Sequence, residues 1–119
     1  MTVYVDDMFE SEMGKFRSMR MSHMVADTDD ELHAMAERIG VARKWHQDSL
    51  SGSHYDIAMS KRALAIEFGA VPITLRQCAM MCANRRQHGT LGEPATCEAV
   101  FRARLAANNA KIKRGKASA

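Results

Sequence analysis

Polar residues able to bind a charged ligand recur in the first 74 residues of this 119-residue sequence. The stretch from 54 to 62 alone contains a histidine, a tyrosine, an aspartate, a lysine and an arginine. Lysine and arginine near the start of a helix suit an anion such as phosphate, and aromatic rings such as Tyr55 and Trp45 can stack on a nucleobase. The candidate ligand-binding residues are His23, His54, Tyr55, Asp56, Lys61 and Arg62. Together they favour a nucleotide or another ligand that carries phosphate.

The aspartates of the same region permit a second chemistry. The candidate metal ligands are Asp6, Asp7 and Asp27. Hard cations prefer carboxylate oxygens, so Mg²⁺ or Mn²⁺ would suit this set, and Asp56 adds a fourth acid. A bound ion would activate water for attack on a phosphate ester, with His54 or His23 as general base. Paired acids after a strand also commonly form a turn, and Asp56 could simply start a helix, so the catalytic residues and the cofactor stay open.

No short motif in the sequence identifies a reaction. The chain contains no Walker loop, no GxGxxG, no HExxH and no paired CxxC. Cys78, Cys82 and Cys97 are odd in number, and a zinc site would need a fourth ligand at a suitable spacing. We expect these cysteines to be buried free thiols in a reducing compartment.

Length and composition bound the class of protein. A chain of 119 residues with 46% apolar and 26% charged residues suits one folded domain and not a disordered segment. No apolar run approaches the roughly 18 residues of a membrane helix, and the N-terminus lacks the pattern of a secretory signal. We therefore expect a cytoplasmic protein with no membrane contact.

Charge is divided unequally along the chain. Residues 1–74 contain 8 Lys/Arg and 12 Asp/Glu, whereas residues 75–119 contain 9 and 2. Four of these cations lie at 111–119, where little apolar content holds the chain in place. The sequence therefore predicts a single domain at residues 1–110 and a flexible basic tail at 111–119. Such a tail could attract a phosphate backbone or only aid solubility.

Local patterns in the first half of the chain predict alternating strands and helices. Residues 2–7 begin with β-branched and aromatic side chains, which predicts a strand that ends in two acids. Residues 28–40 combine a Thr-x-x-Glu capping box, one apolar stripe and a closing glycine, which predicts an amphipathic helix. Residues 41–47 are predicted to be a strand, residues 48–56 a loop, and residues 8–24, which are rich in methionine, receive no assignment.

The second half continues the alternation. The predicted elements are a helix at about 59–68, a strand at 70–74, a helix from Thr74 to about His88, and a helix from Pro94 to about residue 110. Strands separated by helices usually lie parallel, because a parallel pair needs a long crossover. We therefore predict an α/β fold, with a small, mostly parallel sheet of three strands flanked by about four helices.

The predicted parallel sheet would gather the candidate residues at one edge. In such sheets, ligands bind beyond the carboxyl ends of the strands. Asp6 and Asp7 would lie there, beside the loop that carries residues 54–56. His23 and Asp27 could face the same edge.

Five segments, in order, resemble a known family. They are VYVDD, SHMVADTDDELHAMAERIG, HYD, KR and FGAVPIT, and they are similar to short bacterial and phage proteins grouped as domain of unknown function 4031. The resemblance covers about residues 2–78 and implies a small α/β protein, often encoded by phages, with no established activity. The family's recurring polar positions correspond here to Asp6, His23, Asp27, His54, Tyr55 and Asp56. An aromatic residue often precedes the Ser-His element in the family, whereas this chain has Met21.

Three classes of function remain open. The first is a small phage or bacterial accessory protein that binds a nucleotide or nucleic acid and interferes with host defence, with a host defence protein as a further possible partner. The second is a metal-dependent phosphoesterase or nuclease that uses the Asp and His side chains. The third is a protein-interaction module whose basic tail contacts an acidic partner, and the methionine-rich segment leaves room for a homodimer.

Overall fold

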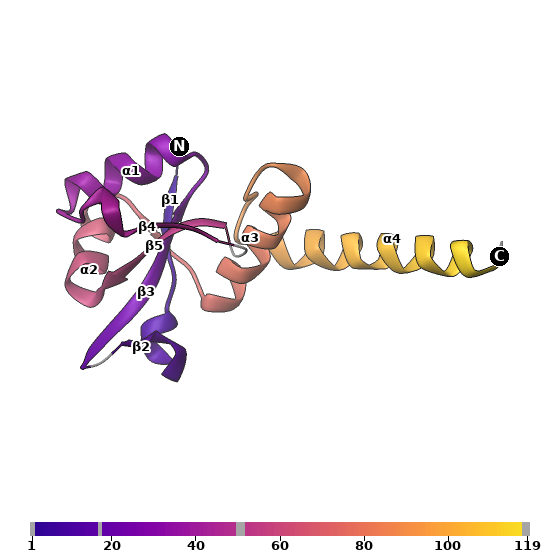
Figure 1. Cartoon of the computed structure of the whole chain (residues 1–119), viewed down its shortest axis with the longest axis horizontal. Coiled ribbons are helices and arrows are strands. Elements are labelled where there is room, and N and C mark those ends of the chain that lie inside the picture. The colour runs from indigo at the N-terminus through magenta and orange to yellow at the C-terminus, as the bar shows by residue number, and fades with distance from the viewer. Residues whose placement is uncertain (1, 17, 50–51, 118–119) are drawn as a thin grey trace.

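The computed structural model describes residues 2–16, 18–49 and 52–117, and the chain folds around a mixed β-sheet (Figure 1). The strands are β1 (Val3–Val5), β2 (Lys15–Phe16), β3 (Met19–Ala26), β4 (His46–Ser49), β5 (Gly52–Ala58) and β6 (Val71–Pro72). The α-helices are α1 (Asp29–Arg38), α2 (Met59–Glu67), α3 (Leu75–His88) and α4 (Cys97–Ala117). Single 3-10 turns are η1 (Met8–Glu10), η2 (Glu12–Gly14) and η3 (Arg43–Trp45). Helices α1 and α2 lie on one side of the sheet and α3 on the other (Figure 1).

The sheet is mainly antiparallel, which corrects the predicted arrangement. Its order is β4-β5-β3-β1-β6, with β2 paired to β3 outside this path. Strand β3 is antiparallel to both β1 and β5, β4 and β5 are antiparallel neighbours, and β1 and β6 run parallel. The α/β class is confirmed, but the prediction of three mostly parallel strands was wrong because it lacked β3. This central strand lies in the methionine-rich segment, where unbranched side chains give little indication of a strand.

Strand β5 also corrects the prediction of a loop at residues 48–56. Its first residue, Gly52, has a φ of +97°, and a Cβ atom there would lie 2.6 Å from Arg85 Nη2. The positive φ favours glycine here, and the end of the flexible Arg85 side chain occupies the space where a Cβ atom would lie. Asp56 lies inside β5 and starts no helix. The strand predicted at 41–47 is divided between η3 and β4.

The two faces of the sheet carry different side chains, because successive residues of a strand alternate. On the side of α1 and α2, Met24, Tyr55 and Ile57 are almost completely buried and pack with Leu32 and Ala36. Burial of an apolar side chain of this size contributes about 1.5–3 kcal/mol. On the side of α3, the apolar core comprises Tyr4, Val25, Ile73, Cys78, Met81, Cys82, Leu91 and Cys97. All three cysteines are free and buried, as the sequence predicts.

Helix ends follow the predicted capping residues. Thr28 Oγ1 accepts a hydrogen bond from the Glu31 amide at 3.2 Å, and Thr74 with Gln77 completes a capping box at α3. Gly89 ends α3 in the left-handed conformation. Strand β6 lies at one end of the sheet order, as Pro72 indicated.

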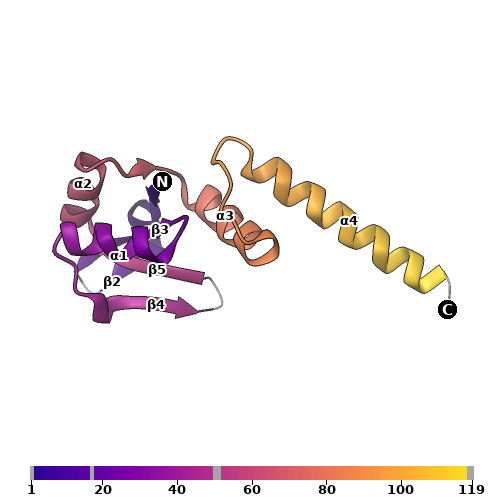
Figure 2. The ribbon, with the colours of Figure 1, turned by 90° about the horizontal axis from the view of Figure 1, so that it is seen from above.

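Helix α4 projects away from the rest of the chain (Figures 1 and 2). It starts three residues after Pro94 and continues past residue 110, so residues 111–117 are helical; the flexibility of the basic tail stays a prediction. Arg76 of α3 and Arg102 of α4 both donate to Glu98 Oε1, at 2.7 and 2.9 Å. Within the described ranges, no helix has the length and apolar content needed to cross a membrane.

Candidate metal centre

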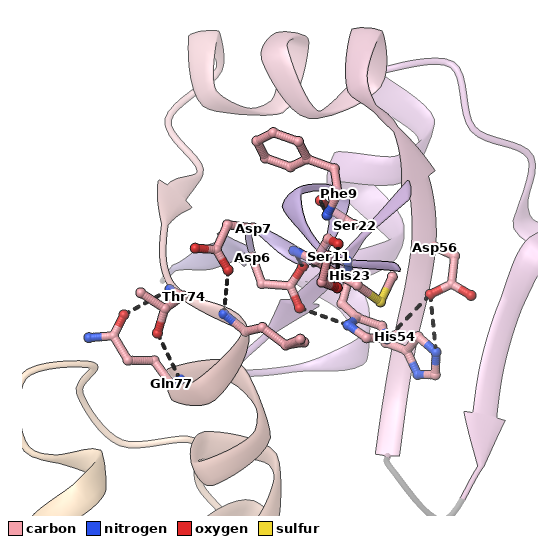
Figure 3. Close-up of polar contacts among 12 residues, drawn as sticks. Asp6, Asp7, Phe9, Ser11, Ser22, His23, His54, Asp56, Thr74 and Gln77 are labelled. Carbon is pink, nitrogen blue, oxygen red and sulfur yellow. Dashed lines mark hydrogen bonds and ion pairs between the residues drawn. The ribbon is translucent and has the colours of Figure 1, made fainter. Parts of the chain in front are cut away.

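Strands β3 and β5 bring two histidines and an aspartate together on the face of the sheet that α3 partly covers (Figure 3). His23 lies directly opposite Asp56 in the antiparallel register. His54 precedes Asp56 by two residues, so both side chains point to the same face. Asp6, just after β1, is held beside His23 because its amide donates to the His23 carbonyl at 3.0 Å. Four of the predicted site residues therefore meet, although not at the edge of a parallel sheet.

Three atoms of the types that bind metals converge at this point. His23 Nε2 and His54 Nε2 each lie 3.6 Å from Asp56 Oδ1. One such atom from each residue lies within 4.8 Å of the other two. Ligands about 2.0–2.2 Å from a tetrahedral metal ion are separated by about 3.3–3.6 Å, so one ion could reach all three after small side-chain adjustments.

Each of the three residues is held by a hydrogen bond at the atom that faces away from the shared point. His23 Nδ1 lies 2.7 Å from Asp6 Oδ2, and His54 Nδ1 lies 2.8 Å from the Gly52 carbonyl. A carboxylate and a carbonyl can only accept, so each Nδ1 carries the proton, and each Nε2 keeps a lone pair when its ring is neutral. Asp56 Oδ2 accepts from Gln47 Nε2 at 2.9 Å. These are the outer contacts that orient metal ligands in proteins.

Charge strengthens the contact between Asp6 and His23. Burial alone would raise the pKa of Asp6, but hydrogen bonds from the His23 ring and from the amides of Met8 and His23 hold it below its usual value. Burial alone would lower the pKa of His23, but the hydrogen bond and the negative charge of Asp6, with a contribution from Asp56, raise it. The pair therefore places negative charge behind His23, which favours a cation at Nε2.

One carboxylate oxygen of the cluster lacks the hydrogen-bond donor that a buried oxygen normally has. Asp56 Oδ1 is inaccessible to solvent and accepts no hydrogen bond from the described residues, although the side chain as a whole is 34% exposed. An unsatisfied buried acceptor costs about 1–3 kcal/mol, and more when it is charged. A cation between Asp56 and the two imidazoles would remove this cost.

A second set, comprising Asp6, His23 and Cys78, is also compact but less suitable. Its metal-binding atoms lie within 4.8 Å of one another. Asp6 already accepts hydrogen bonds from the Met8 amide, the His23 amide and the His23 ring. The pKa of the Cys78 thiol is raised by its hydrogen bond with Cys82 and by burial, so the thiolate that a metal needs is disfavoured. An ion here would have to break existing bonds, whereas His23, His54 and Asp56 can bind one without doing so.

The preferred ligand set indicates which ions would bind. Two imidazoles and one carboxylate suit Zn²⁺, Fe²⁺ or Mn²⁺ better than Mg²⁺, which prefers oxygen ligands. Structural zinc sites usually have four protein ligands, whereas catalytic sites have three and keep a position for water or substrate. Three protein ligands therefore match a catalytic centre.

The cluster opens on a cleft of about 540 Å³ between the sheet and α3. Its lining includes His23, His54 and two cationic residues of α3, Arg76 and Arg86. Arginine is well suited to bind phosphate and carboxylate groups. The cleft therefore combines a candidate metal centre with side chains that attract an anion.

Cys82 also lines this cleft. Its hydrogen bond with Cys78 lowers the pKa of the Cys82 thiol to about 7, and the positive charges of Arg85, His23 and Arg86 act in the same direction against burial. The positive charges that lower the pKa of Cys82 would also attract an anionic ligand in the cleft.

Two predicted site residues support the cluster from outside it. Arg62 Nε donates to the Asp6 carbonyl at 2.8 Å, and its guanidinium lies over the Phe9 ring. Asp7 Oδ1 accepts from the Leu75 amide at 2.6 Å and thus binds the start of α3. In these positions Arg62 fixes the backbone next to His23, and Asp7 fixes the helix that lines the cleft.

Three predicted site residues lie away from the cluster. Asp27 follows the end of β3 that pairs with the start of β1, about 13 Å along the strand from His23. Lys61 lies near Gly40, which follows α1. Tyr55 points to the opposite face of β5, where its hydroxyl lies 2.7 Å from His33 Nδ1.

The face of β5 that carries Tyr55 has its own histidine cluster. The His33 and His46 ring centroids are 4.7 Å apart, and His46 Nε2 lies 2.6 Å from Ser53 Oγ. Burial lowers the pKa of His33, and the charges of Arg43 and His46 add to this effect. Burial also raises the pKa of Tyr55. Among the described residues, these contacts pair imidazoles with hydroxyl groups, and Asp29 and Asp30 act on His33 only through their charge.

Sequence reasoning did not assign a site role to four residues around the cluster. Arg76, Cys82 and Arg86 line the cleft, and Gln47 donates to Asp56. One signal was present: in His54-x-Asp56, alternation along a strand would have placed both side chains on one face. Gln47 becomes a neighbour through the pairing of β4 with β5, and the three residues of α3 through packing of that helix on the sheet.

Comparison with known families matches residues 3–85 to the family described as "Protein of unknown function (DUF4031)". The match covers more than half of the chain, so the protein belongs to this family, and the resemblance seen in the sequence is confirmed. No curated protein and no solved structure matches the chain.

Proposed function

We propose that this DUF4031 protein is a divalent-metal-dependent hydrolase of phosphate esters. The observation that carries the proposal is the convergence of His23 Nε2, His54 Nε2 and Asp56 Oδ1, each held in orientation by another protein group. In the proposed centre, Asp7 and Asp27, which the sequence predicted as metal ligands, do not contact the ion. Asp6 does not bind the ion either and instead orients His23.

The reaction class follows from the ligand set and from the cleft beside it. When bound, an ion with open coordination positions polarises a phosphoryl oxygen and makes water a better nucleophile at neutral pH. Hydrolysis adds the water oxygen to phosphorus and breaks one P–O ester bond, and the leaving oxygen takes up a proton. The products are a phosphate with one ester bond fewer and an alcohol, and no oxidant or reductant is needed.

The residues of this chain have distinct tasks in that reaction. Arg76 and Arg86 line the cleft and would neutralise the negative charge of the substrate. Asp6 and Gln47 keep His23 and Asp56 in place. The two arginines also favour phosphoryl chemistry over the oxygen chemistry that two histidines and a carboxylate support with Fe²⁺.

Binding of a phosphate-bearing ligand without hydrolysis is the second candidate, and the same two arginines favour it. The other expectations from the sequence stay predictions: a phage or bacterial accessory role, interference with host defence, a host defence partner, a homodimer, a protein-interaction role for the basic tail and a cytoplasmic location.

The proposal is tested by adding Mn²⁺, Zn²⁺, Fe²⁺ or Mg²⁺ to protein stripped with EDTA and measuring the melting temperature and the hydrolysis of bis(4-nitrophenyl) phosphate. A ligand that binds the folded state raises the melting temperature by mass action. We expect Mn²⁺ or Zn²⁺ to produce both signals in the wild type and neither in Asp56→Ala.

Asp48→Ala is the matched control, because Asp48 is an exposed aspartate on the adjacent strand β4, outside the candidate centre. It should keep both signals. Metal binding without hydrolysis would leave the ligand-binding candidate, and the absence of both signals in the wild type would contradict the metal centre itself.

A further inference from the structure

The candidate metal centre lies where two hollows of the protein surface meet. The first is the arginine-lined cleft described above, of about 540 Å³, to which His23 and His54 contribute. The second, the aromatic hollow, has about 450 Å³ and is lined by Asp56, Gln47, Trp45, Phe16, Lys15 and others. Met13 lines both. A ligand long enough to occupy both hollows would therefore cross the candidate metal centre.

The aromatic hollow exposes large apolar side chains that a folded chain normally covers. Trp45 is 60% exposed, Phe16 58% and Met13 74%. Cations accompany them: Lys44 Nζ lies 5.2 Å from the centre of the Trp45 ring, and Lys15 lines the hollow. Exposed aromatic rings beside lysines match the way proteins hold unpaired nucleobases, with rings for stacking and cations for phosphates.

The arginine-lined cleft extends this pattern on the other side of the centre. Arg76 and Arg86 are ten residues apart on α3, which corresponds to about 15 Å along the helix. Glu98 contacts both Arg76 and Arg102, so two cations share one carboxylate and this end of the cleft keeps net positive charge. Positive charge spread over that distance fits several phosphates in a row better than one small anion.

We propose that the substrate is single-stranded nucleic acid, which crosses the centre with phosphates along the arginine-lined cleft and bases on the aromatic hollow. This inference rests on the proposed hydrolase function, for which it names the substrate class. The scissile phosphodiester lies at His23, His54 and Asp56. Duplex nucleic acid is excluded from the aromatic hollow, because its bases are stacked on each other and cannot turn onto a side-chain ring.

The test measures binding of fluorescein-labelled oligothymidylate by fluorescence anisotropy in EDTA, and its cleavage in Mn²⁺, using the full chain. Trp45→Ala is expected to weaken binding by about 10- to 100-fold, since stacking on an aromatic ring contributes strongly to each base. Phe68→Ala, at an aromatic residue 37% exposed that follows α2, should bind as the wild type does.

A second pair of variants tests the cations. Arg76→Ala should weaken binding and reduce the salt dependence by about one counterion. Arg102→Ala is its matched control, because Arg102 donates to the same Glu98 oxygen and does not line the cleft. It should leave both properties unchanged.

The outcomes separate this inference from the proposed function. If the wild type hydrolyses bis(4-nitrophenyl) phosphate but binds oligothymidylate no better than thymidine monophosphate or a duplex, the substrate class is wrong and the hydrolase stands. Equal binding by Trp45→Ala and Phe68→Ala would also overturn the inference. If the wild type takes up no metal, the hydrolase fails, and Trp45-dependent oligonucleotide binding would then identify a binding protein.

Discussion

Strand β5 separates two pairs of histidines that differ in what their rings face. On the α3 side, His23 and His54 use Nδ1 for protein acceptors, and both Nε2 atoms approach Asp56 Oδ1. On the α1 side, His33 pairs with the Tyr55 hydroxyl and His46 with Ser53. Both pairs are close, with ring centroids 5.2 and 4.7 Å apart. For the proposed metal centre, the direction of the unused lone pairs therefore matters more than the proximity of two imidazoles.

The two faces also differ in the charges that surround their histidines. The hydrogen bond and negative charge of Asp6 raise the pKa of His23 despite burial, whereas burial, Arg43 and His46 lower the pKa of His33. A cation is therefore favoured beside His23 and disfavoured beside His33. Variants that change a side chain on one face at a time should show which face binds metal.

The largest expected effect comes from removing a histidine of the candidate centre, with a histidine of the opposite face as the control. His54→Ala should reduce Mn²⁺ or Zn²⁺ affinity by more than about 100-fold, because loss of a ligand should exceed the 10- to 100-fold effect of losing an outer partner. His46→Ala removes a histidine from the opposite face and should change affinity by less than about twofold. Isothermal titration calorimetry measures both, and similar losses in the two variants would contradict the assignment.

Asp6→Asn should have the next largest effect, because it changes which nitrogen of His23 carries the proton. The asparagine Oδ1 can still accept from the Met8 and His23 amides, but its NH₂ group would face His23 Nδ1. Nδ1 must then accept, so the proton moves to Nε2 and blocks the metal. Metal affinity should fall by about 10- to 100-fold. Asp27→Asn, one residue beyond the end of β3, should leave calorimetric titrations unchanged, and equal affinity in both variants would rule out this role of Asp6.

The same pair should control how stability depends on pH in the absence of metal. The pKa of Asp6 is lowered from 3.8, so its contribution is complete above that pH and is lost as the pH falls through the folded-state value. The pKa of His23 is raised from 6.5, so its contribution is complete below that pH and is lost as the pH rises through the folded-state value. In EDTA, wild type should exceed Asp6→Asn in melting temperature most between about pH 3.8 and 6.5. A constant difference from pH 3 to 9 would contradict the ion pair.

Tyr55→Phe should have the smallest effect on metal affinity and should lower the free energy of unfolding only moderately. It removes the hydroxyl that contacts His33 on the opposite face, and loss of one hydrogen bond costs about 0.5–1.5 kcal/mol. Urea denaturation should show that loss, while calorimetry shows unchanged metal affinity. A substantial loss of metal affinity would mean that the two faces of β5 are coupled.

Local elements were predictable wherever one segment contained its own signals. The capping residues of α1 and α3 and the position of α2 follow from short-range chemistry that the chain displays in order. The sheet was not predictable in the same way. Strand β3 has a methionine-rich sequence with weak strand preference, and its pairing with β1 and β5 depends on residues far apart in the chain.

Four of the predicted site residues do lie together, but the strand arrangement that brings them together differs from the predicted one. Parallel strands ending at one edge were expected to gather Asp6 and His54, whereas the antiparallel register of β3 with β5 sets His23 opposite Asp56. Tyr55 was grouped with His54 and Asp56 because residues 48–56 were predicted to be a loop. In a strand, its side chain points to the face opposite theirs. The arginines of the cleft depend on how α3 packs on the sheet, which no local pattern contains.

Crystals grown with Mn²⁺ and measured for anomalous scattering would test the metal centre most directly. We predict a single strong peak about 2.0–2.3 Å from His23 Nε2, His54 Nε2 and one Asp56 oxygen, absent in crystals of Asp56→Ala. A peak bound by Asp7 or Asp27, a peak between Asp6 and Cys78, or no peak at saturating Mn²⁺ would contradict it.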